Sequence, residues 1–321
     1  MTSRLIVVTG AAGFIGSGIV RQLQGRRLIL VDHLDHPEKI RNLAGKSYEE
    51  LLSIQGLFTW LEGRGSEIEA IIHLGACSDT LETNLDFLYE NNTRYTQRLA
   101  QYALEHGIRF IYASSAATYG DGAQGFSDDH AQIPTLSPLN PYGQSKQNFD
   151  LWALREGILG KIVGLKYFNV FGPNEAHKGR MASMVYKMVP LIQKEGVVRL
   201  YKSNDPAKFG DGEQCRDFIY VKDAAAMTCS FLDNSWGGIY NIGLGSPTTW
   251  NQLATAIFEA LKLPVRIEYI DTPPDLSKQY QNYTCAQMAK FSGGKKIPFA
   301  YDIESAVTDY VQNHLLLDQP W

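Results

Sequence analysis

Residues 5–16 read Leu-Ile-Val-Val-Thr-Gly-Ala-Ala-Gly-Phe-Ile-Gly, and this stretch predicts the fold. Its first four residues form an apolar run, which suits a strand buried on both faces of a sheet. Gly10, Gly13 and Gly16 then stand three residues apart, and a helical pattern of apolar residues begins at Ile15. The first glycine allows a tight turn, the second lets the backbone approach a pyrophosphate, and the third lets the helix pack on the sheet. Because a helix amino terminus attracts phosphate, this strand, turn and helix predict a dinucleotide-binding site.

The rest of the chain extends this pattern into an α/β fold. With 321 residues it is long enough for a nucleotide-binding domain and a smaller second lobe. Strand-like apolar runs alternate with helical patterns up to about residue 170. We therefore expect a Rossmann-type doubly wound parallel sheet with a smaller mixed α/β substrate lobe. Residues 1–170 would form mainly the NAD(P)-binding domain, and residues 171–321 mainly the substrate-binding lobe, with some segments returning to the first domain.

Individual elements can also be predicted. Residues 44–62 suggest one or two short helices, and residues 86–106 a long one that contains Asn91 and Asn92. Asparagine is a modest helix former, so this pair marks either a structural hydrogen bond or a polar site. Further helices are expected at 184–194 and 249–261, the second opened by a capping box, and a strand at 216–221.

Composition excludes several classes of protein. The net charge is −4 and no basic run suggests nucleic-acid binding. The four cysteines are scattered, and no third ligand lies near His33 and His36, so we expect neither a disulfide framework nor a metal site. No signal peptide is recognisable and no apolar run approaches the roughly 20 residues of a membrane span, which favours a cytoplasmic protein without membrane contact.

The residues after the second strand leave the cofactor open. Asp32 follows the apolar run 28–31, where an acid about 20 residues beyond the glycines usually bonds the ribose 2′-hydroxyl and favours NAD. His33 and Lys39 come next, and a cation there could hold a 2′-phosphate instead.

Tyr142 and Lys146 are the candidate chemical centre. Spaced four apart on a helix, they share one face. A phenol has a reference pKa of about 10, and a neighbouring ammonium favours its ionised form. Lys146 could thus hold the cofactor's ribose and bias Tyr142 toward proton abstraction, although the same spacing also fits an ordinary exposed pair. Ser115 lies near the end of the strand that begins at residue 110, where open α/β sheets bind ligands.

These motifs, with Arg-Asp-Phe-Ile-Tyr-Val at 216–221, resemble the extended short-chain dehydrogenase/reductase family over essentially the whole chain. Within it, the stretches 75–78, 113–119 and 177–183 resemble the ADP-glyceromanno-heptose 6-epimerases, the last (His-Lys-Gly-Arg-Met-Ala-Ser) being the most discriminating. Sugar-nucleotide 4,6-dehydratases of the family carry an Asp-Glu pair where this chain has Ala116 and Ala117. A dehydratase would therefore lack its acid and base.

The resemblance implies epimerisation at C6″ of ADP-D-glycero-D-manno-heptose, which supplies heptose for the lipopolysaccharide core. A secondary alcohol carbon without a neighbouring carbonyl has no acidic C–H, so inversion requires transient oxidation to a ketone and return of the hydride to its other face. Two acid/base groups then serve the two orientations of the oxygen. The resemblance implies that Tyr142 and Lys178 are these groups and that Ser115 hydrogen-bonds the reacting oxygen.

It further implies NADP rather than NAD, and a homo-oligomer that is a pentamer. The implied cofactor-binding residues are Gly10, Gly13, Phe14, Ile15, Gly16, Asp32, His33, Lys39, Leu74, Gly75, Ala76, Cys77, Ser78, Asn91, Lys146 and Val170. The implied substrate-binding residues are Asn169, Arg180, Lys187, Tyr201, Lys202, Ser203, Asn204, Arg216 and Tyr280. Arg180 and Lys187 stand where the family often has Ser and His.

Two other functions compete with this interpretation. A UDP-hexose 4-epimerase shares Tyr142 and Lys146 but does not need Lys178. A cofactor-sensing regulator would bind NADP(H) without turnover, and such proteins often lose the tyrosine or the lysine, whereas this chain has both.

Overall fold

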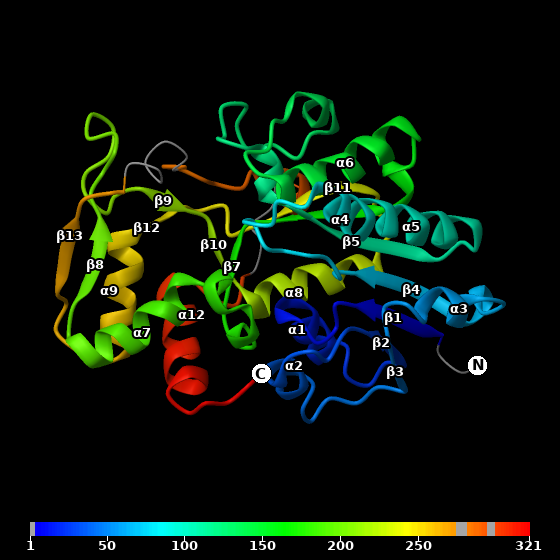
Figure 1. Cartoon of the computed structure of the whole chain (residues 1–321), viewed down its shortest axis with the longest axis horizontal. Helices are drawn as coiled ribbons and strands as arrows, with labels where there is room; N and C mark the ends of the chain where they lie inside the picture. The colour runs from blue at the N-terminus through cyan, green and yellow to red at the C-terminus, as the bar shows by residue number, and fades with distance from the viewer. Residues whose placement is uncertain (1–3, 274–280, 294–298) are drawn as a thin grey trace.

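The main sheet consists of parallel strands whose order reverses beside β1. The computed structural model describes residues 4–273, 281–293 and 299–321. Seven strands pair in the order β11-β6-β5-β4-β1-β2-β3, all parallel. They are β1 (Leu5–Thr9), β2 (Leu28–Val31), β3 (Glu50–Leu52), β4 (Ile68–His73), β5 (Arg109–Ser115), β6 (Val163–Tyr167) and β11 (Gly238–Ile242). The predicted doubly wound sheet is confirmed, and its switch point lies between β1 and β4 (Figure 1), where such sheets bind ligands.

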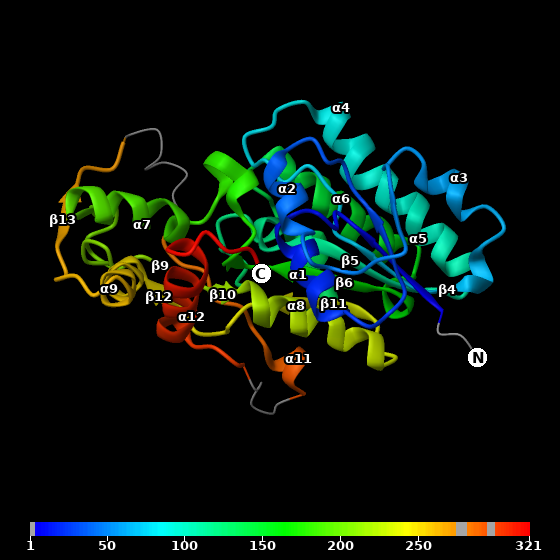
Figure 2. The same ribbon diagram turned by 90° about the horizontal axis from the view of Figure 1, so that it is seen from below.

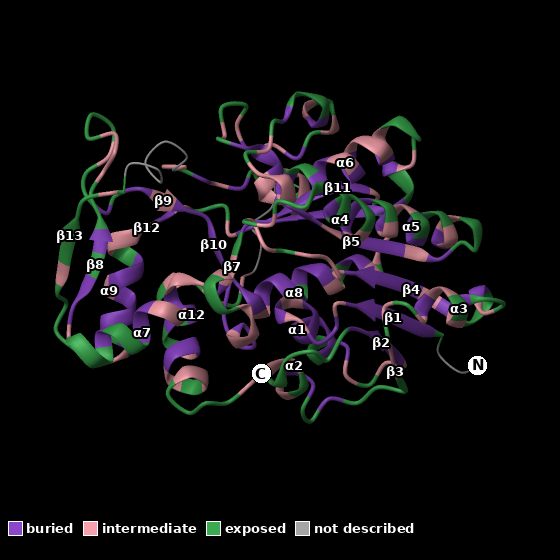
Figure 3. Ribbon diagram, in the orientation of Figure 1, coloured by how far each residue is buried: buried purple, intermediate pink, exposed green. Residues whose placement is uncertain are grey.

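Both faces of this sheet are covered, and the strands β1, β2, β6 and β11 bury every residue. Ile6 and Val8 of β1 belong to a core cluster with residues of α1 and α8, whereas Val7 belongs to one with residues of α3, α5 and α6. Figure 2 shows these two sets of helices on opposite sides of the sheet, and Figure 3 shows that the central strands are mostly buried. The helices are α1 (Phe14–Gln22), α2 (Pro37–Asn42), α3 (Leu57–Leu61), α4 (Leu85–Leu88), α5 (Tyr95–Glu105), α6 (Pro141–Arg155) and α8 (Val221–Ser230).

The smaller lobe lies beyond the carboxyl ends of the main strands (Figure 1). Its core is built from side chains of α7, α9, α12 and β8. Its elements, with the short strands that lead to it, are β7 (Asn169–Phe171), α7 (Met184–Glu195), β8 (Val198–Tyr201), β9 (Cys215–Arg216), β10 (Phe218–Tyr220), β12 (Thr248–Thr249), α9 (Trp250–Ala260), β13 (Ile267–Ile270), α11 (Ala289–Ser292) and α12 (Ile303–Asp309). Since α8 and β11 pack in the main domain, the chain crosses between the lobes more than once.

The structure corrects one expectation and confirms two others. Residues 44–62 contain α3 but also the strand β3, which was not predicted because this short edge strand has no buried residue. The long helix predicted at 86–106 is present, as α4, a π-helical turn at Tyr89–Arg94 and α5 in direct succession. The predicted capping box is present, with Thr249 and Gln252 bonding each other's backbone N–H.

The end of the chain returns to the domain built on the main sheet. Asn174 bonds the backbone of Trp321 in both directions, at 2.9 Å each. Arg41 of α2 pairs with Asp318 at 3.1 Å. These contacts fasten the smaller lobe beside α1 and α2. Within residues 4–273, 281–293 and 299–321, none of the helices has the length and apolar character needed to cross a membrane.

His73 at the end of β4 is buried between two hydroxyl groups. Thr9 Oγ1 lies 2.6 Å from its Nδ1, and Thr96 Oγ1 lies 2.9 Å from its Nε2. Burial, together with the nearby Lys146 cation, lowers the pKa of His73 to about 3. The imidazole is therefore neutral in the folded protein at neutral and mildly acidic pH.

This burial predicts a pH dependence of stability. The unfolded state binds a proton at His73 below about pH 6.5 and the folded state does not, so stability falls as pH drops from 6.5 toward 3, by about 1.4 kcal/mol per pH unit from this group. We expect urea unfolding of His73→Gln to show a shallower dependence between pH 6.5 and 5. Thr96→Val, which keeps the ring, should keep the wild-type slope; equal slopes in wild type and His73→Gln would contradict the prediction.

Candidate active site

The glycine turn after β1 admits no side chains at two of its positions. Gly10 has φ +66°, and a Cβ on Gly16 would lie 1.9 Å from the Gly10 carbonyl oxygen. Gly13 caps the amino terminus of α1 without a side chain, and its N–H donates to Gly10 at 3.0 Å. A bare backbone at a helix amino terminus fits a pyrophosphate. These residues therefore suit the cofactor that the sequence predicts.

Asp32 links this turn to the loop after β2. Its carboxylate accepts the N–H of Ala12 at 2.8 Å and that of His33 at 2.7 Å. Lys39 of α2 approaches the same carboxylate at 3.3 Å and pairs with Asp35 at 2.8 Å. The acid and the cation considered for cofactor choice thus form one cluster. A ribose 2′-hydroxyl could bond the carboxylate, and a 2′-phosphate could pair with the lysine.

The segment after β4 passes directly over the glycine turn. The N–H of Gly75 donates to Thr9 Oγ1 at 3.1 Å, and a Cβ on Gly10 would lie 2.7 Å from the Gly75 nitrogen. Asn92 holds this segment by accepting from the Cys77 N–H and donating to its carbonyl, both at 2.9 Å. Asn91 donates to the Asn92 side chain at 2.9 Å. Of the two asparagines, Asn92 therefore makes the buried structural hydrogen bonds. Contact between Asn91 and the cofactor stays a prediction.

Ser115, Tyr142 and Lys146 meet where α6 packs against the end of β5. Ser115 shares a hydrogen bond with Tyr142, which lowers the pKa of this phenol, but burial has the larger effect and raises it. Lys146 donates to the Ala113 carbonyl at 2.8 Å, and burial lowers its pKa to about 8 against the opposing charge of Asp150. The structure thus places these three predicted residues together and holds the tyrosine as a phenol at neutral pH.

Lys178 lies on the 3₁₀ turn Ala176–Met181, which packs beside α2. Its Nζ lies 5.1 Å from the centre of the Phe14 ring, on the first residue of α1. Burial lowers the pKa of Lys178, and the nearby Lys187 adds to this, while Glu175 opposes it. Arg180, on the same turn, forms an ion pair with Asp79 of the segment after β4. Lys178 is therefore a shielded amine beside the predicted cofactor site, consistent with a proton-transfer role.

The predicted substrate residues form two groups. Arg180 and Lys187 lie together, with the Lys187 ammonium donating to the Arg180 carbonyl at 2.6 Å. The second group lies in the smaller lobe and includes Arg216, whose guanidinium lies 5.9 Å from the centre of the Trp250 ring. Its other members are Tyr201, Lys202, Ser203 and Asn204, at and after the end of β8.

The remaining predicted residues lie elsewhere. Asn169, predicted to bind substrate, and Val170, predicted to bind cofactor, begin β7. Tyr280, predicted to bind substrate, lies outside the described residues.

A cavity of about 470 Å³ lies between the loop that follows β8 and the segment that joins β5 to α6. Asp205, Lys208 and Phe209 line it from the smaller lobe, and Phe126 and Leu139 line it from the segment between β5 and α6. Its position next to residues 201–204 suits part of an extended substrate.

Two buried carboxylates near the site were not predicted. Asp150 lies one helical turn beyond Lys146 and pairs with Lys166 of β6 at 2.9 Å. Its spacing of four residues from Lys146 could have indicated that Asp150 lies on the same helix face. Nothing in the sequence indicates that Lys166 is its partner. Glu175 accepts a hydrogen bond from Tyr310 Oη at 2.9 Å, and nothing local in the sequence indicates this contact.

The glycine turn yields a direct prediction. Gly16→Ala forces a methyl group against the Gly10 carbonyl, so the turn must open and cofactor affinity should fall at least tenfold. Fluorescence titration with NADPH or NADH measures this. Gly160→Ala is the matched control, because a Cβ there meets no atom within 4 Å, and it should bind as wild type does. Unchanged affinity in Gly16→Ala would show that the turn does not hold the dinucleotide.

Comparison with known proteins places the chain among nucleotide-sugar enzymes. The model of the NAD dependent epimerase/dehydratase family matches residues 6–243. An ADP-L-glycero-D-manno-heptose-6-epimerase from Nitratidesulfovibrio vulgaris strain DP4 is 45% identical, covering 99% of this chain and 100% of that protein.

Two solved structures are similar in fold. The Helicobacter pylori ADP-L-glycero-D-manno-heptose-6-epimerase aligns with a TM-score of 0.81 at 26% identity, over 97% of this chain and 96% of that one. A UDP-N-acetylglucosamine 4-epimerase from Methanobrevibacter ruminantium has the same TM-score at 25% identity, over 99% and 100%. Fold similarity therefore does not separate the two kinds of epimerase, whereas sequence identity favours the first.

Proposed function

Because the chain belongs to the NAD dependent epimerase/dehydratase family, we propose that it is an isomerase that inverts C6″ of ADP-D-glycero-D-manno-heptose. The product, ADP-L-glycero-D-manno-heptose, would serve the lipopolysaccharide core. The observation that carries this proposal is the half-buried Lys178 beside α1, which would supply a second proton carrier in addition to Tyr142. A 4-epimerase of hexoses does not need it.

The roles of the chain's residues follow from their surroundings. A bound nicotinamide supplies the hydride acceptor and donor. Tyr142 and Lys178 exchange protons with the substrate oxygen, one for each orientation of the ketone in the site. Ser115 Oγ bonds the same oxygen and stabilises charge that develops on it. Lys146, cationic below about pH 8, would hold the cofactor's ribose and favour ionisation of Tyr142.

We expect both proton carriers to be required for turnover. NMR of ADP-D-glycero-D-manno-heptose should show conversion at C6″ by wild type, and at least a hundredfold slower conversion by Tyr142→Phe and by Lys178→Met. Lys194→Met, which removes an exposed lysine of α7, is the control for loss of a charge. No conversion by cofactor-loaded wild type would reject the substrate and leave UDP-hexoses as the next candidates. Conversion by Lys178→Met at the wild-type rate would remove this residue from the mechanism.

We further propose a preference for NADP over NAD, based on the resemblance and on Lys39 beside Asp32. A 2′-phosphate would pair with the Lys39 ammonium, which now lies against two carboxylates. The resemblance also leads us to propose a homo-oligomer, a pentamer, and a cytoplasmic location.

The cofactor preference predicts a selective loss. Lys39→Ala should weaken NADPH binding at least tenfold and change NADH binding by less than twofold, because only NADPH carries the 2′-phosphate. Arg41→Ala, on the same helix and paired with Glu38 and Asp318, is the control and should alter neither. Equal losses for both dinucleotides would contradict a 2′-phosphate contact at Lys39.

A further inference from the structure

We propose that Glu175 is a positioning residue for Lys178: its carboxylate fixes the turn that carries the lysine and supplies a negative charge near it. This inference rests on the proposed role of Lys178. Glu175 is not proposed to touch the substrate or the cofactor, and it would act through Lys178.

The carboxylate bonds both ends of the loop between β7 and α7. It accepts the backbone N–H of Gly172 at 3.3 Å on one side, and the N–H and the hydroxyl of Ser183 on the other, the latter at 2.7 Å. Ser183 also caps α7. In between, the Glu175 carbonyl accepts the N–H of Lys178 at 2.9 Å. One residue thus closes the loop across its base and starts the turn that carries the amine.

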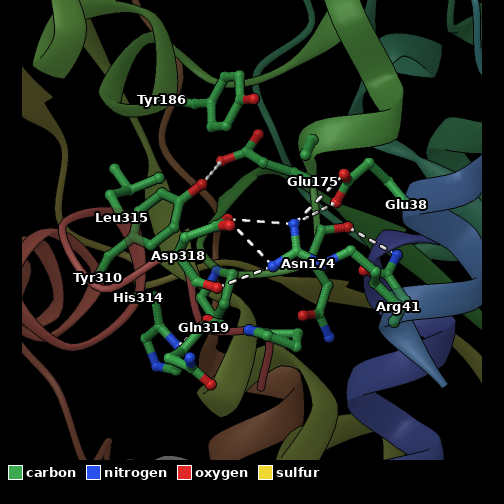
Figure 4. Close-up of a pocket in the computed structure, with 14 residues that line it drawn as sticks. Glu38, Arg41, Asn174, Glu175, Tyr186, Tyr310, His314, Leu315, Asp318 and Gln319 are labelled. Atoms are coloured by element: carbon green, nitrogen blue, oxygen red, sulfur yellow. Dashed lines mark hydrogen bonds and ion pairs between the residues drawn. The ribbon is translucent and has the colours of Figure 1, made fainter. Parts of the chain in front are cut away.

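A fourth donor arrives from a distant part of the chain. Tyr310, fully buried after α12, donates to the Glu175 carboxylate at 2.9 Å. Figure 4 shows this bond at the edge of a cavity of about 220 Å³ between the loop and the C-terminal segment. Because Glu175 is 1% exposed, a carboxylate with four donors is held in one orientation.

The charges around Lys178 are unbalanced without Glu175. His177 lies on the same turn, and burial lowers the pKa of this imidazole to about 4, so it is neutral. Lys187 of α7 is a further cation, and α1 contributes the uncharged Phe14 ring. At the far end of the turn Arg180 is paired with Asp79. Burial raises the pKa of Glu175, while the bonds from Ser183 and Tyr310 and the nearby Lys178 cation oppose this and favour the carboxylate. In its ionised form Glu175 is the negative charge that favours protonated Lys178.

The experiment measures Lys178 itself. The protein is labelled with ¹⁵N-lysine, Lys178→Met assigns the Nζ signal, and the signal is titrated with pH in the cofactor-loaded wild type and in Glu175→Gln. Removing the negative charge disfavours the ammonium, so we expect the midpoint to move to lower pH by about one unit. The limb of the kcat profile that reports Lys178 should move in the same direction.

Asp223→Asn is the matched control. Asp223 is also a buried carboxylate that accepts backbone N–H groups, from Ala300 at 3.0 Å and Tyr301 at 3.2 Å, but it lies away from Lys178. This variant should lose stability without moving the Lys178 midpoint. An unchanged midpoint in folded Glu175→Gln would overturn the inference. The titration does not depend on turnover, so failure of the heptose assay in wild type rejects the proposed function separately.

If Glu175→Gln does not fold, Tyr310→Phe replaces it in a double-mutant cycle. This variant removes one donor and leaves the carboxylate. It should lower kcat threefold to tenfold in the wild-type background and cause no further loss in Lys178→Met, since both act through the same amine. Equal losses in the two backgrounds would show a merely structural contact and overturn the inference.

Discussion

A buried ion pair joins the helix that carries Tyr142 to the main sheet. Asp150 and Lys166 are 0% and 1% exposed, so both charges have lost their water. Such a pair is tolerated only where the remaining donors and acceptors are satisfied. Tyr112 and Ser114 of β5 donate to Asp150, and Lys166 also bonds Thr118. The elements so joined also carry Ser115 and Lys146, and the arrangement of the site depends on this cluster.

The same burial sets the protonation of the candidate catalytic groups. Loss of water favours the neutral form of every titratable side chain, so the pKa of Tyr142 rises while those of Lys146 and Lys178 fall. Without a bound cofactor, Tyr142 is therefore a neutral phenol, and Lys146 and Lys178 lose their protons at lower pH than an exposed lysine does. The positive ring of a bound oxidised nicotinamide would favour the ionised form of Tyr142, and under the proposed mechanism proton transfer would then depend on cofactor loading.

The parts of the site that the sequence predicted are those with local signals. The spacing of Gly10, Gly13 and Gly16 follows from a single turn, and Tyr142 with Lys146 from a single helix face. The position of Asp32 could be predicted because it lies at the end of the second strand, one strand–helix–strand unit after the start of the first. The edge strand β3 escaped prediction because it is three residues long and has no buried side chain, so no apolar run marks it.

Contacts between distant segments could not be predicted. Nothing in the sequence pairs Arg180 with Asp79, Lys166 with Asp150, or Glu175 with Tyr310, because each pairing depends on how complete elements pack. The resemblance drew attention to Lys178 by its motif, but the surroundings of this lysine became visible only in three dimensions.

The contact between Glu175 and Tyr310 spans 135 positions. Segments so far apart meet only after the intervening chain has been ordered, since closing a long loop costs entropy before the contact forms. During synthesis the glycine turn is made well before Tyr310, the partner that completes the Lys178 loop. A growing chain would therefore form its glycine turn before the loop that carries Lys178 is fixed in place.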